Sequence, residues 1–359
     1  MSLLSDGNNN NSLLTVAWQD NDDGSALIKL IDQTKLPENL EYIVCTNHFE
    51  VADAIKNLSI RGAPAIGVAG AMGLGLCIIN YKSNNREELL SELRQAYDIL
   101  LKTRPTAVNL KWGLDKVVEA SLKFETVEKI KENVVNVVKK MSEDDINTNR
   151  SMGRFGSQLI NDGDKIMTHC NAGALATVSY GTALGVIRSA KESGKKISIF
   201  ATETRPVMQG SRLTAFELVH DKIDVSLVPD TAVGYIMMNK MVDKVIVGAD
   251  RILKTGHVFN KIGTYQIAQL AYLHSIPFYV AAPLSTFDLN SDLDAIVIEE
   301  RSPDEVLKIG GKRIAPESVK VFNPAFDLTP PNLIAGIITE KGIIFPPFEK
   351  NISAMVEIK

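Results

Sequence analysis

The sequence predicts an α/β protein with a mainly helical amino-terminal domain and a Rossmann-like, doubly wound parallel-sheet carboxyl-terminal domain. Three observations predict this class. The chain has 359 residues, more than one hydrophobic core usually organises. Helical patterns dominate the first part of the chain. Beyond residue 162, short β-rich runs alternate with helical segments, which indicates βαβ units.

The amino-terminal elements are expected in residues 1–150. Residues 1–12 are polar and Asn-rich, lack the features of a secretory signal and predict a disordered tail. The segment 18–37 predicts a small β entry structure at the start of the helical domain, 13–150. Helical periodicity then predicts helices over 50–57, the Gly/Ala-rich stretch after Pro64, 86–102, 110–124 and 127–160.

The carboxyl-terminal elements are expected in a catalytic domain that spans 151–359. Short β-rich runs predict strands over 165–170, 197–202, 225–228, 244–248, 278–282 and 295–298. Helices between them would cover both faces of a parallel sheet. In such sheets ligands bind beyond the carboxyl ends of the strands, so we look for chemistry there.

Composition and charge narrow the function classes. The hydrophobic content of 45% and charged content of 23% are ordinary for a globular protein. A net charge of −4 supplies no positive field, so we expect neither a nucleic-acid nor a membrane partner. Three widely spaced cysteines favour a reducing compartment, the cytoplasm. Segment 63–79 is apolar but shorter than the roughly 20 residues that span a bilayer, and it predicts a closely packed buried helix.

Cys170 is the first candidate for chemistry. It ends a β-rich run and precedes Asn-Ala-Gly and a small-residue helical segment from Ala174. A thiol between a strand end and a helix amino terminus has a lowered pKa, which favours the thiolate. A small buried hydrophobic residue is an equally good interpretation, because free cysteines are among the most buried residues.

Asp250 is the second candidate. It closes the apolar run 245–249, so the same edge of the sheet receives a carboxylate. Partial desolvation there would raise the carboxyl pKa towards neutrality and suit it to proton transfer. A helix cap or turn former is a slightly better interpretation on position alone.

Several short motifs suit a phosphate group. One places a cation and a glycine before a predicted helix start, and another places Asn260 where it would cap the helix predicted over 265–274. Taken singly, such a cation is more often a solvated surface charge. The candidate phosphate ligands in these motifs are Arg61, Gly62, Ala63, Arg104, Gln209, Asn260 and Lys261.

Metal and nucleotide motifs are missing from the sequence. The five histidines and three cysteines form no zinc spacing, so we predict no metal site and no cofactor. The glycines at 67, 70, 73 and 75 do not form GxGxxG, which argues against a nicotinamide-dependent dehydrogenase. Close helix packing explains these glycines better.

A set of motifs in fixed order carries a resemblance to a known family. They are Asp-Gln-Thr at 32–34 followed by Leu-Pro, Ile-Arg-Gly-Ala-Pro-Ala-Ile-Gly at 60–67, Thr-His-Cys-Asn-Ala-Gly at 168–173, Thr-Arg-Pro at 204–206, Gly-Ala-Asp-Arg at 248–251, Asn-Lys-Ile-Gly-Thr at 260–264 and Asn-Pro-Ala-Phe-Asp at 323–327. Over roughly 18–342 the chain resembles the methylthioribose-1-phosphate isomerases and the related initiation-factor 2B regulatory subunits.

The resemblance implies an activity and roles for the candidates. It implies an aldose-ketose isomerase that converts 5-methylthioribose 1-phosphate to 5-methylthioribulose 1-phosphate in methionine salvage. Cys170 and Asp250 would be catalytic, the seven candidate ligands would bind phosphate and sugar, and no cofactor would be needed. The family also implies a homodimer.

Two other activities share the architecture. A ribose 1,5-bisphosphate isomerase would keep Cys170 and Asp250 but would need cations for a second phosphate, whereas Trp18 and residues 32–34 resemble the methylthioribose branch. A regulatory subunit would lack catalysis, and retention of the two catalytic residues argues against it. Proton transfer by Cys170 and a hydride shift assisted by Asp250 are equally compatible with the sequence.

Overall fold

The computed structural model describes residues 13–105 and 107–357. The predicted tail, 1–12, lies outside them. Spatial contacts divide the chain into two compact units: residues up to Arg150 together with Gly173–Gly185, and Ser151–Ala172 together with Val186 onward. The predicted domains, 13–150 and 151–359, differ from these units in the segment Gly173–Gly185. Each unit is described by itself below.

The first unit begins with a three-stranded antiparallel sheet. Its strands are β1 (Val16–Asp20), β2 (Ala26–Ile31) and β3 (Tyr42–Cys45), in the order β1-β2-β3. Ile28 and Leu30 alternate along β2 and are fully buried against the helices. The predicted β entry structure corresponds to β1 and β2, and β3 extends it.

Helices fill the rest of the first unit. They are α1 (His48–Lys56), α2 (Ala63–Asn80), α3 (Arg86–Thr103), α4 (Val108–Ser121) and the start of α5 (Val127–Ser157), all within a few residues of the predicted ranges. Helix α2 is long and apolar enough to cross a membrane by length and composition, and 78% of its most apolar window is buried inside the protein. It is a core helix of this unit.

Glycines allow α2 and α4 to approach closely. A Cβ at Gly113 would lie 2.2 Å from the carbonyl oxygen of Gly67, and one at Gly67 would lie 2.7 Å from the carbonyl oxygen of Asn109. Any side chain would push the two helices apart. The packing role predicted for the glycines of α2 is therefore confirmed.

A seven-stranded sheet forms the centre of the second unit, which confirms the predicted Rossmann-like class. The strand order is β16-β15-β10-β7-β4-β5-β6, and every neighbouring pair is parallel except β15 and β16. The strands are β4 (Lys165–Thr168), β5 (Ser198–Thr202), β6 (Asp224–Val228), β7 (Lys244–Val247), β10 (Phe278–Ala281), β15 (Gly336–Thr339) and β16 (Gly342–Ile344).

Helices bury the central strands. All four residues of β7 are buried, as expected for a strand covered on both faces. Its Val245 and Val247 share a core with α8 and α9, while Ile246 between them is buried on the other face. Helices of this unit include most of α6 (Ala183–Glu192) and all of α7 (Ala215–His220), α8 (Val233–Met238), α9 (Thr264–Leu273) and α11 (Phe348–Glu357).

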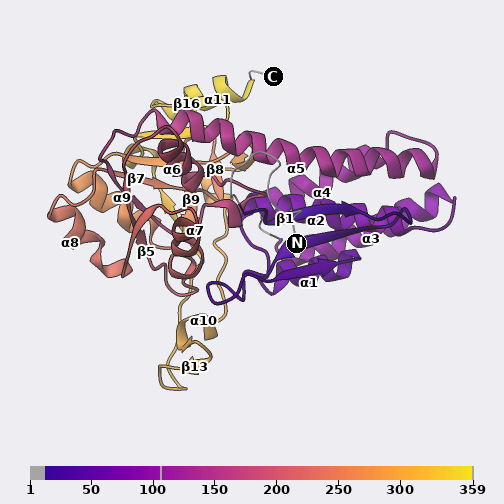
Figure 1. Cartoon of the computed structure of the whole chain (residues 1–359), viewed down its shortest axis with the longest axis horizontal. Helices are drawn as coiled ribbons and strands as arrows, with labels where there is room; N and C mark the ends of the chain where they lie inside the picture. Colours follow the sequence, from indigo (N-terminus) through magenta and orange to yellow (C-terminus); the bar gives the residue numbers. More distant parts are fainter. Residues whose placement is uncertain (1–12, 106, 358–359) are drawn as a thin grey trace. The chain divides into compact units, whose positions relative to one another are not determined.

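A smaller sheet, β11-β8-β9-β14, accompanies the large one. Strands β8 (Arg251–Leu253) and β9 (Val258–Lys261) form an antiparallel pair between β7 and α9 in the chain, and β14 (Phe326–Thr329) and β11 (Phe287–Asp288) complete the sheet. Helix α10 (Asp304–Leu307) and the hairpin β12 (Lys308–Ile309) and β13 (Lys312–Arg313) stand away from both sheets of this unit (Figure 1).

Two predicted elements are wrong. The strand expected over 295–298 is irregular chain after a 3-10 turn at Leu293–Ala295, and its apolar Val297 is 80% exposed. The helix expected from Ala174 is only a 3-10 turn at Ala174–Ala176, and the next helix begins at Ala183. Within the first unit, Thr15 and Gln33 donate hydrogen bonds to the carbonyl oxygens of residues 174 and 175, at 2.7 Å each. The oxygen of Ala174 also accepts the N–H of Thr177 at 3.1 Å, which closes the 3-10 turn, and the turn ends there because Thr177 is extended.

Candidate active site

The order of the strands creates a topological switch point at the carboxyl edge of the second unit's sheet, between β4 and β7. From β4 the chain moves to β5 and β6 on one side, and then returns to β7 on the other side of β4. The loops that leave β4 and β7 therefore diverge, and such switch points are where open α/β sheets bind ligands. Cys170 follows β4 by two residues, and Asp250 follows β7 by three. Both candidates lie at the ends of neighbouring strands, whose axes are about 4.8 Å apart.

Cys170 occupies a tight turn. Its φ of 61° is left-handed, a conformation that costs a non-glycine residue roughly 1–2 kcal/mol. Its N–H donates to Thr204 Oγ1 at 2.8 Å, and its carbonyl accepts from Thr214 Oγ1 at 2.6 Å. The residue is 8% exposed. Two threonine hydroxyls thus hold the turn, and the helix expected to face the thiol from Ala174 is not formed.

Asp250 stands where β7 gives way to β8. Its N–H donates to the carbonyl of Phe259 in β9 at 2.9 Å, and the chain continues as a strand at Arg251. No helix starts here, so the role of helix cap that position alone suggested is wrong. The residue is half-buried.

A buried histidine joins the ends of β4 and β9. His169 Nε2 lies 2.8 Å from the carbonyl of Ile262, and Nδ1 lies 2.6 Å from Thr202 Oγ1. Burial lowers the pKa of His169, so the ring is neutral, donating through Nε2 and accepting at Nδ1. Asn260 and Lys261 at the end of β9 are therefore brought to the same edge as Cys170 and Asp250.

The start of α9 is capped from a distant strand. Asp327 of β14 accepts the N–H groups of Gly263 at 2.7 Å and Tyr265 at 3.1 Å, and burial raises the pKa of its carboxyl to about 6. The prediction that Asn260 caps this helix is wrong. Asn260 instead donates through Nδ2 to Thr264 Oγ1 at 3.0 Å.

Gln209 lies in the loop after β5, which neighbours β4. Thr204, which binds the Cys170 N–H, also accepts the N–H of Met208 through its carbonyl at 2.8 Å, and Gln209 follows directly. The side chain is 8% exposed, and its Oε1 is buried without a hydrogen-bond partner among the described residues. Because buried polar atoms are normally paired, this oxygen suits a ligand hydroxyl.

The remaining candidates belong to the first unit. Arg61, Gly62 and Ala63 lie at the start of α2, where Gly62 is the cap with a φ of 98°. A Cβ on Gly62 would lie 2.4 Å from Cα of Ala176, so the turn at 174–176 requires glycine there. The first N–H groups of this 18-residue helix suit an anion. Arg104 ends α3 as its C-cap.

The sequence prediction missed several side chains of the second unit's site. The hydroxyls of Thr204 and Thr214 and the ring of His169 contact or support the candidates, and Asp327 fixes the start of α9. Three of them lie inside motifs that were recognised: His169 in Thr-His-Cys, Thr204 in Thr-Arg-Pro and Asp327 in Asn-Pro-Ala-Phe-Asp. For His169 and Thr204, the sequence signal that could have found them was an imidazole or a hydroxyl placed just after the end of a strand.

Comparisons with known proteins agree with this architecture. The sequence model of the Initiation factor 2 subunit family matches residues 59–346. A protein of Archaeoglobus fulgidus named putative methylthioribose-1-phosphate isomerase is 52% identical, covering 94% of this chain and 98% of its own. A Thermotoga maritima protein named methylthioribose-1-phosphate isomerase is also 52% identical, covering 96% and 98%.

Solved structures give the same result. The 5-methylthioribose 1-phosphate isomerase of Pyrococcus horikoshii is 42% identical with a TM-score of 0.89, covering 96% of this chain and 97% of its own. A structure from A. fulgidus titled translation initiation factor eIF-2B, subunit delta, is 50% identical with a TM-score of 0.85, covering 96% and 100%. With the family model and these relatives spanning most of its length, the chain belongs to the initiation factor 2 subunit family.

Proposed function

We propose that the chain is a methylthioribose-1-phosphate isomerase, which converts 5-methylthioribose 1-phosphate to 5-methylthioribulose 1-phosphate. The observation that carries the proposal is that Cys170 and Asp250 follow the neighbouring strands β4 and β7 at the switch point of the sheet. Relatives with that activity in their names are 52% identical over most of this chain. The product would enter methionine salvage.

The substrate sets a specific chemical problem. Its anomeric oxygen carries phosphate, so the sugar cannot open to a free aldehyde, and the enzyme must assist cleavage of the ring C–O bond. In the first route, Asp250 protonates the ring oxygen or orients the hydroxyls, while Cys170 moves a proton from C2 to C1. In the second, hydride passes from C2 to C1 and Asp250 assists.

An isotope experiment separates the two routes. Substrate deuterated at C2 is converted in ordinary water, and the deuterium at C1 of the product is measured by mass spectrometry. A base that exchanges with solvent loses the label, whereas a hydride shift retains it. Full retention would contradict a Cys170 base that exchanges its proton freely with solvent and would favour the hydride shift assisted by Asp250.

The other candidates suit the remaining parts of the substrate. Arg61 and the first N–H groups of α2 are suited to a phosphate. In the second unit, Gln209 and Asn260 carry buried amides that suit sugar hydroxyls, and Lys261 adds a cation at the end of β9. Arg104 remains a predicted ligand.

Turnover of two sugars tests the proposal. The purified protein is given 5-methylthioribose 1-phosphate and ribose 1,5-bisphosphate separately and then in competition, with ketone formation as the readout. We expect conversion of the first and weak competition by the second. Preference for the bisphosphate would replace the proposed substrate, and conversion of neither would refute an isomerase.

A regulatory role is the second candidate, because one similar structure is titled as an initiation-factor subunit. Such a protein would act by binding without turnover. This hypothesis would be supported if the protein converted neither sugar but formed a stable complex with a translation initiation factor. Ordinary turnover without such a complex would contradict it.

Compartment and assembly complete the proposal. We infer a cytoplasmic homodimer. The three cysteines are all buried and form no disulfide, which suits a reducing compartment. Analytical ultracentrifugation of the purified chain tests the assembly, and a monomer at micromolar concentration would contradict it.

A further inference from the structure

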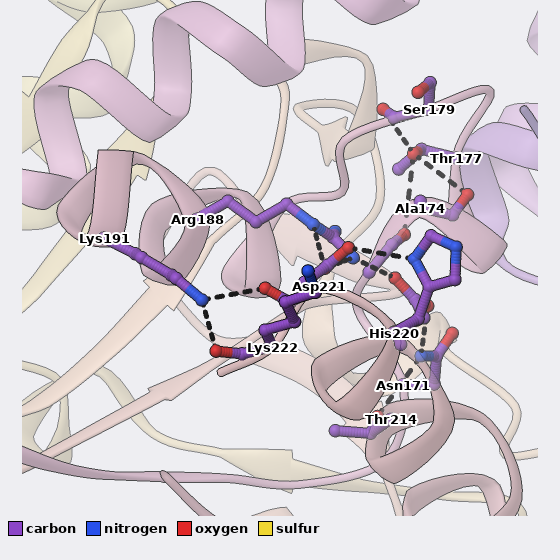
Figure 2. Close-up of polar contacts among 12 residues, drawn as sticks. Asn171, Ala174, Thr177, Ser179, Arg188, Lys191, Thr214, His220, Asp221 and Lys222 are labelled. Atoms are coloured by element: carbon purple, nitrogen blue, oxygen red, sulfur yellow. Dashed lines mark hydrogen bonds and ion pairs between the residues drawn. The ribbon is translucent and has the colours of Figure 1, made fainter. Parts of the chain in front are cut away.

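A buried ion pair lies behind the Cys170 turn in the second unit. Arg188 of α6 contacts Glu217 of α7, with Nη2 and Oε2 2.7 Å apart. Their side chains are 5% and 0% exposed. In Figure 2 the side chain of Arg188 extends to Asp221, and Asn171 lies next to Thr214.

Hydrogen bonds connect this pair to the cysteine. Asn171 Nδ2 donates to Glu217 Oε1 at 2.8 Å and to Thr214 Oγ1 at 3.2 Å. Thr214 Oγ1 in turn donates to the carbonyl of Cys170 at 2.6 Å. The carboxylate therefore reaches the peptide group between Cys170 and Asn171 through two side chains.

Stability alone is a poor explanation for the pair. Removing two charges from water costs about as much as their attraction returns, and well-packed apolar residues often serve as well. The pair is instead attached to a residue in a left-handed conformation, which persists only where surrounding contacts impose it.

The direction of the hydrogen bonds requires a carboxylate. An ionised Glu217 only accepts, so it fixes the amide of Asn171 with its NH₂ group inward. Thr214 then accepts from Asn171, and its single proton is left for the carbonyl of Cys170. A glutamine at 217 could present its own NH₂ group and break this order.

We propose that Glu217, held by Arg188, is a positioning residue that fixes the turn carrying the Cys170 thiol. The proposal rests on the proposed isomerase function for its kinetic consequence. Its structural consequence, the reactivity of the thiol, is independent of the substrate.

The chain offers a matched control. Asp221 also contacts Arg188, with Oδ2 accepting from Nε at 2.7 Å, and it takes part in neither of the two hydrogen bonds that join Asn171 to Glu217 and Thr214 (Figure 2). Asp221→Asn therefore weakens the same guanidinium pairing without touching the turn. Glu217→Gln removes the charge that orders Asn171.

Three readouts on the full-length protein test the proposal: thermal midpoint, kcat and KM, and the pH profile of Cys170 alkylation by iodoacetamide. We expect Glu217→Gln to lower kcat about 10- to 100-fold with little change in KM, because small misplacement of a reacting group has effects of this size. Its alkylation profile should shift. Asp221→Asn should keep the kcat and alkylation profile of the unaltered protein.

Thr214 supplies a second pair of variants should Glu217→Gln fail to fold. Thr214→Val should shift the alkylation profile, and Thr214→Ser, which keeps the hydroxyl, should not. The proposal would be overturned if Glu217→Gln kept the kcat and alkylation profile of the unaltered protein. Where Glu217→Gln does not fold, the same result in Thr214→Val would overturn it. A loss of kcat in Asp221→Asn as large as that in Glu217→Gln would also overturn it. An unaltered protein without turnover would refute the isomerase function, while the alkylation profiles would still decide the positioning role.

Discussion

Asp145 of α5 makes the stability of the protein depend on pH. Its Oδ2 accepts the N–H of Val178 at 2.8 Å and Nδ2 of Asn149 at 3.0 Å within the first unit. Burial of the carboxyl raises its pKa from 3.8 to about 7. The folded protein therefore binds a proton that the unfolded chain has lost between these two values, and stability falls as pH rises through this window.

The size of the effect follows from the shift. At 1.36 kcal/mol per pKa unit, the whole window is worth about 4 kcal/mol, of which roughly 2 to 3 lies between about pH 5 and about pH 8. The residue as a whole is only half-buried, so solvent reduces this figure, and we expect about 2 kcal/mol. Asp145→Asn keeps an acceptor for Val178 but cannot ionise.

Guanidinium unfolding of both proteins at about pH 5 and about pH 8 measures the effect. The unaltered protein should lose about 2 kcal/mol more than Asp145→Asn on going to the higher pH. His169 and Asp327 also have shifted pKa values, but both are present in the two proteins and cancel in the comparison. Equal losses in the two proteins would refute the assignment of the buried charge to Asp145.

Two further predictions concern the candidate site. Gly62→Ala should lower turnover at least about 10-fold, because its Cβ would clash with the turn at 174–176. The control Gly24→Ala has a similar φ of 79° and nothing within 4 Å of the added Cβ, so it should keep normal turnover. Equal losses of turnover in the two variants would contradict the clash as the cause. Burial raises the thiol pKa of Cys45 to about 12 and of Cys77 to about 11. Cys170 is buried as well, but it lies at the edge of the sheet where ligands bind. Peptide mapping after brief iodoacetamide treatment near neutral pH should therefore find the label on Cys170 first, and faster labelling of Cys45 or Cys77 would contradict this.

The position of the site at the carboxyl edge of the sheet could be predicted from the sequence, because the central strands have a strong apolar pattern. The run 244–248 is apolar after Lys244, and the run 165–170 has a buried apolar centre at Ile166 and Met167, since β4 and β7 lie between helices on both faces of the sheet. A polar residue directly after such a run stands at the edge where ligands bind. Cys170 and Asp250 could be chosen on that ground alone, and their catalytic roles stay a prediction.

Contacts between distant residues could not be predicted in the same way. Asp327 caps a helix that begins more than 60 residues earlier, and Glu217 orders Asn171 from 46 residues away. The helix expected from Ala174 ends after one 3-10 turn, where side chains of Thr15 and Gln33 bind the carbonyl groups of residues 174 and 175. Local patterns carry no information on such partners, so tertiary contacts overrode propensity.

The most direct test of the isomerase assignment is a ¹³C NMR time course with 5-methylthioribose 1-phosphate labelled at C2. The unaltered protein should convert the C2 hydroxyl-carbon signal into a ketone signal, and Cys170→Ser and Asp250→Asn, folded by circular dichroism, should leave it unchanged. A ketone signal that grows at the same rate in all three proteins would show that the chemistry does not depend on the residues at the ends of β4 and β7.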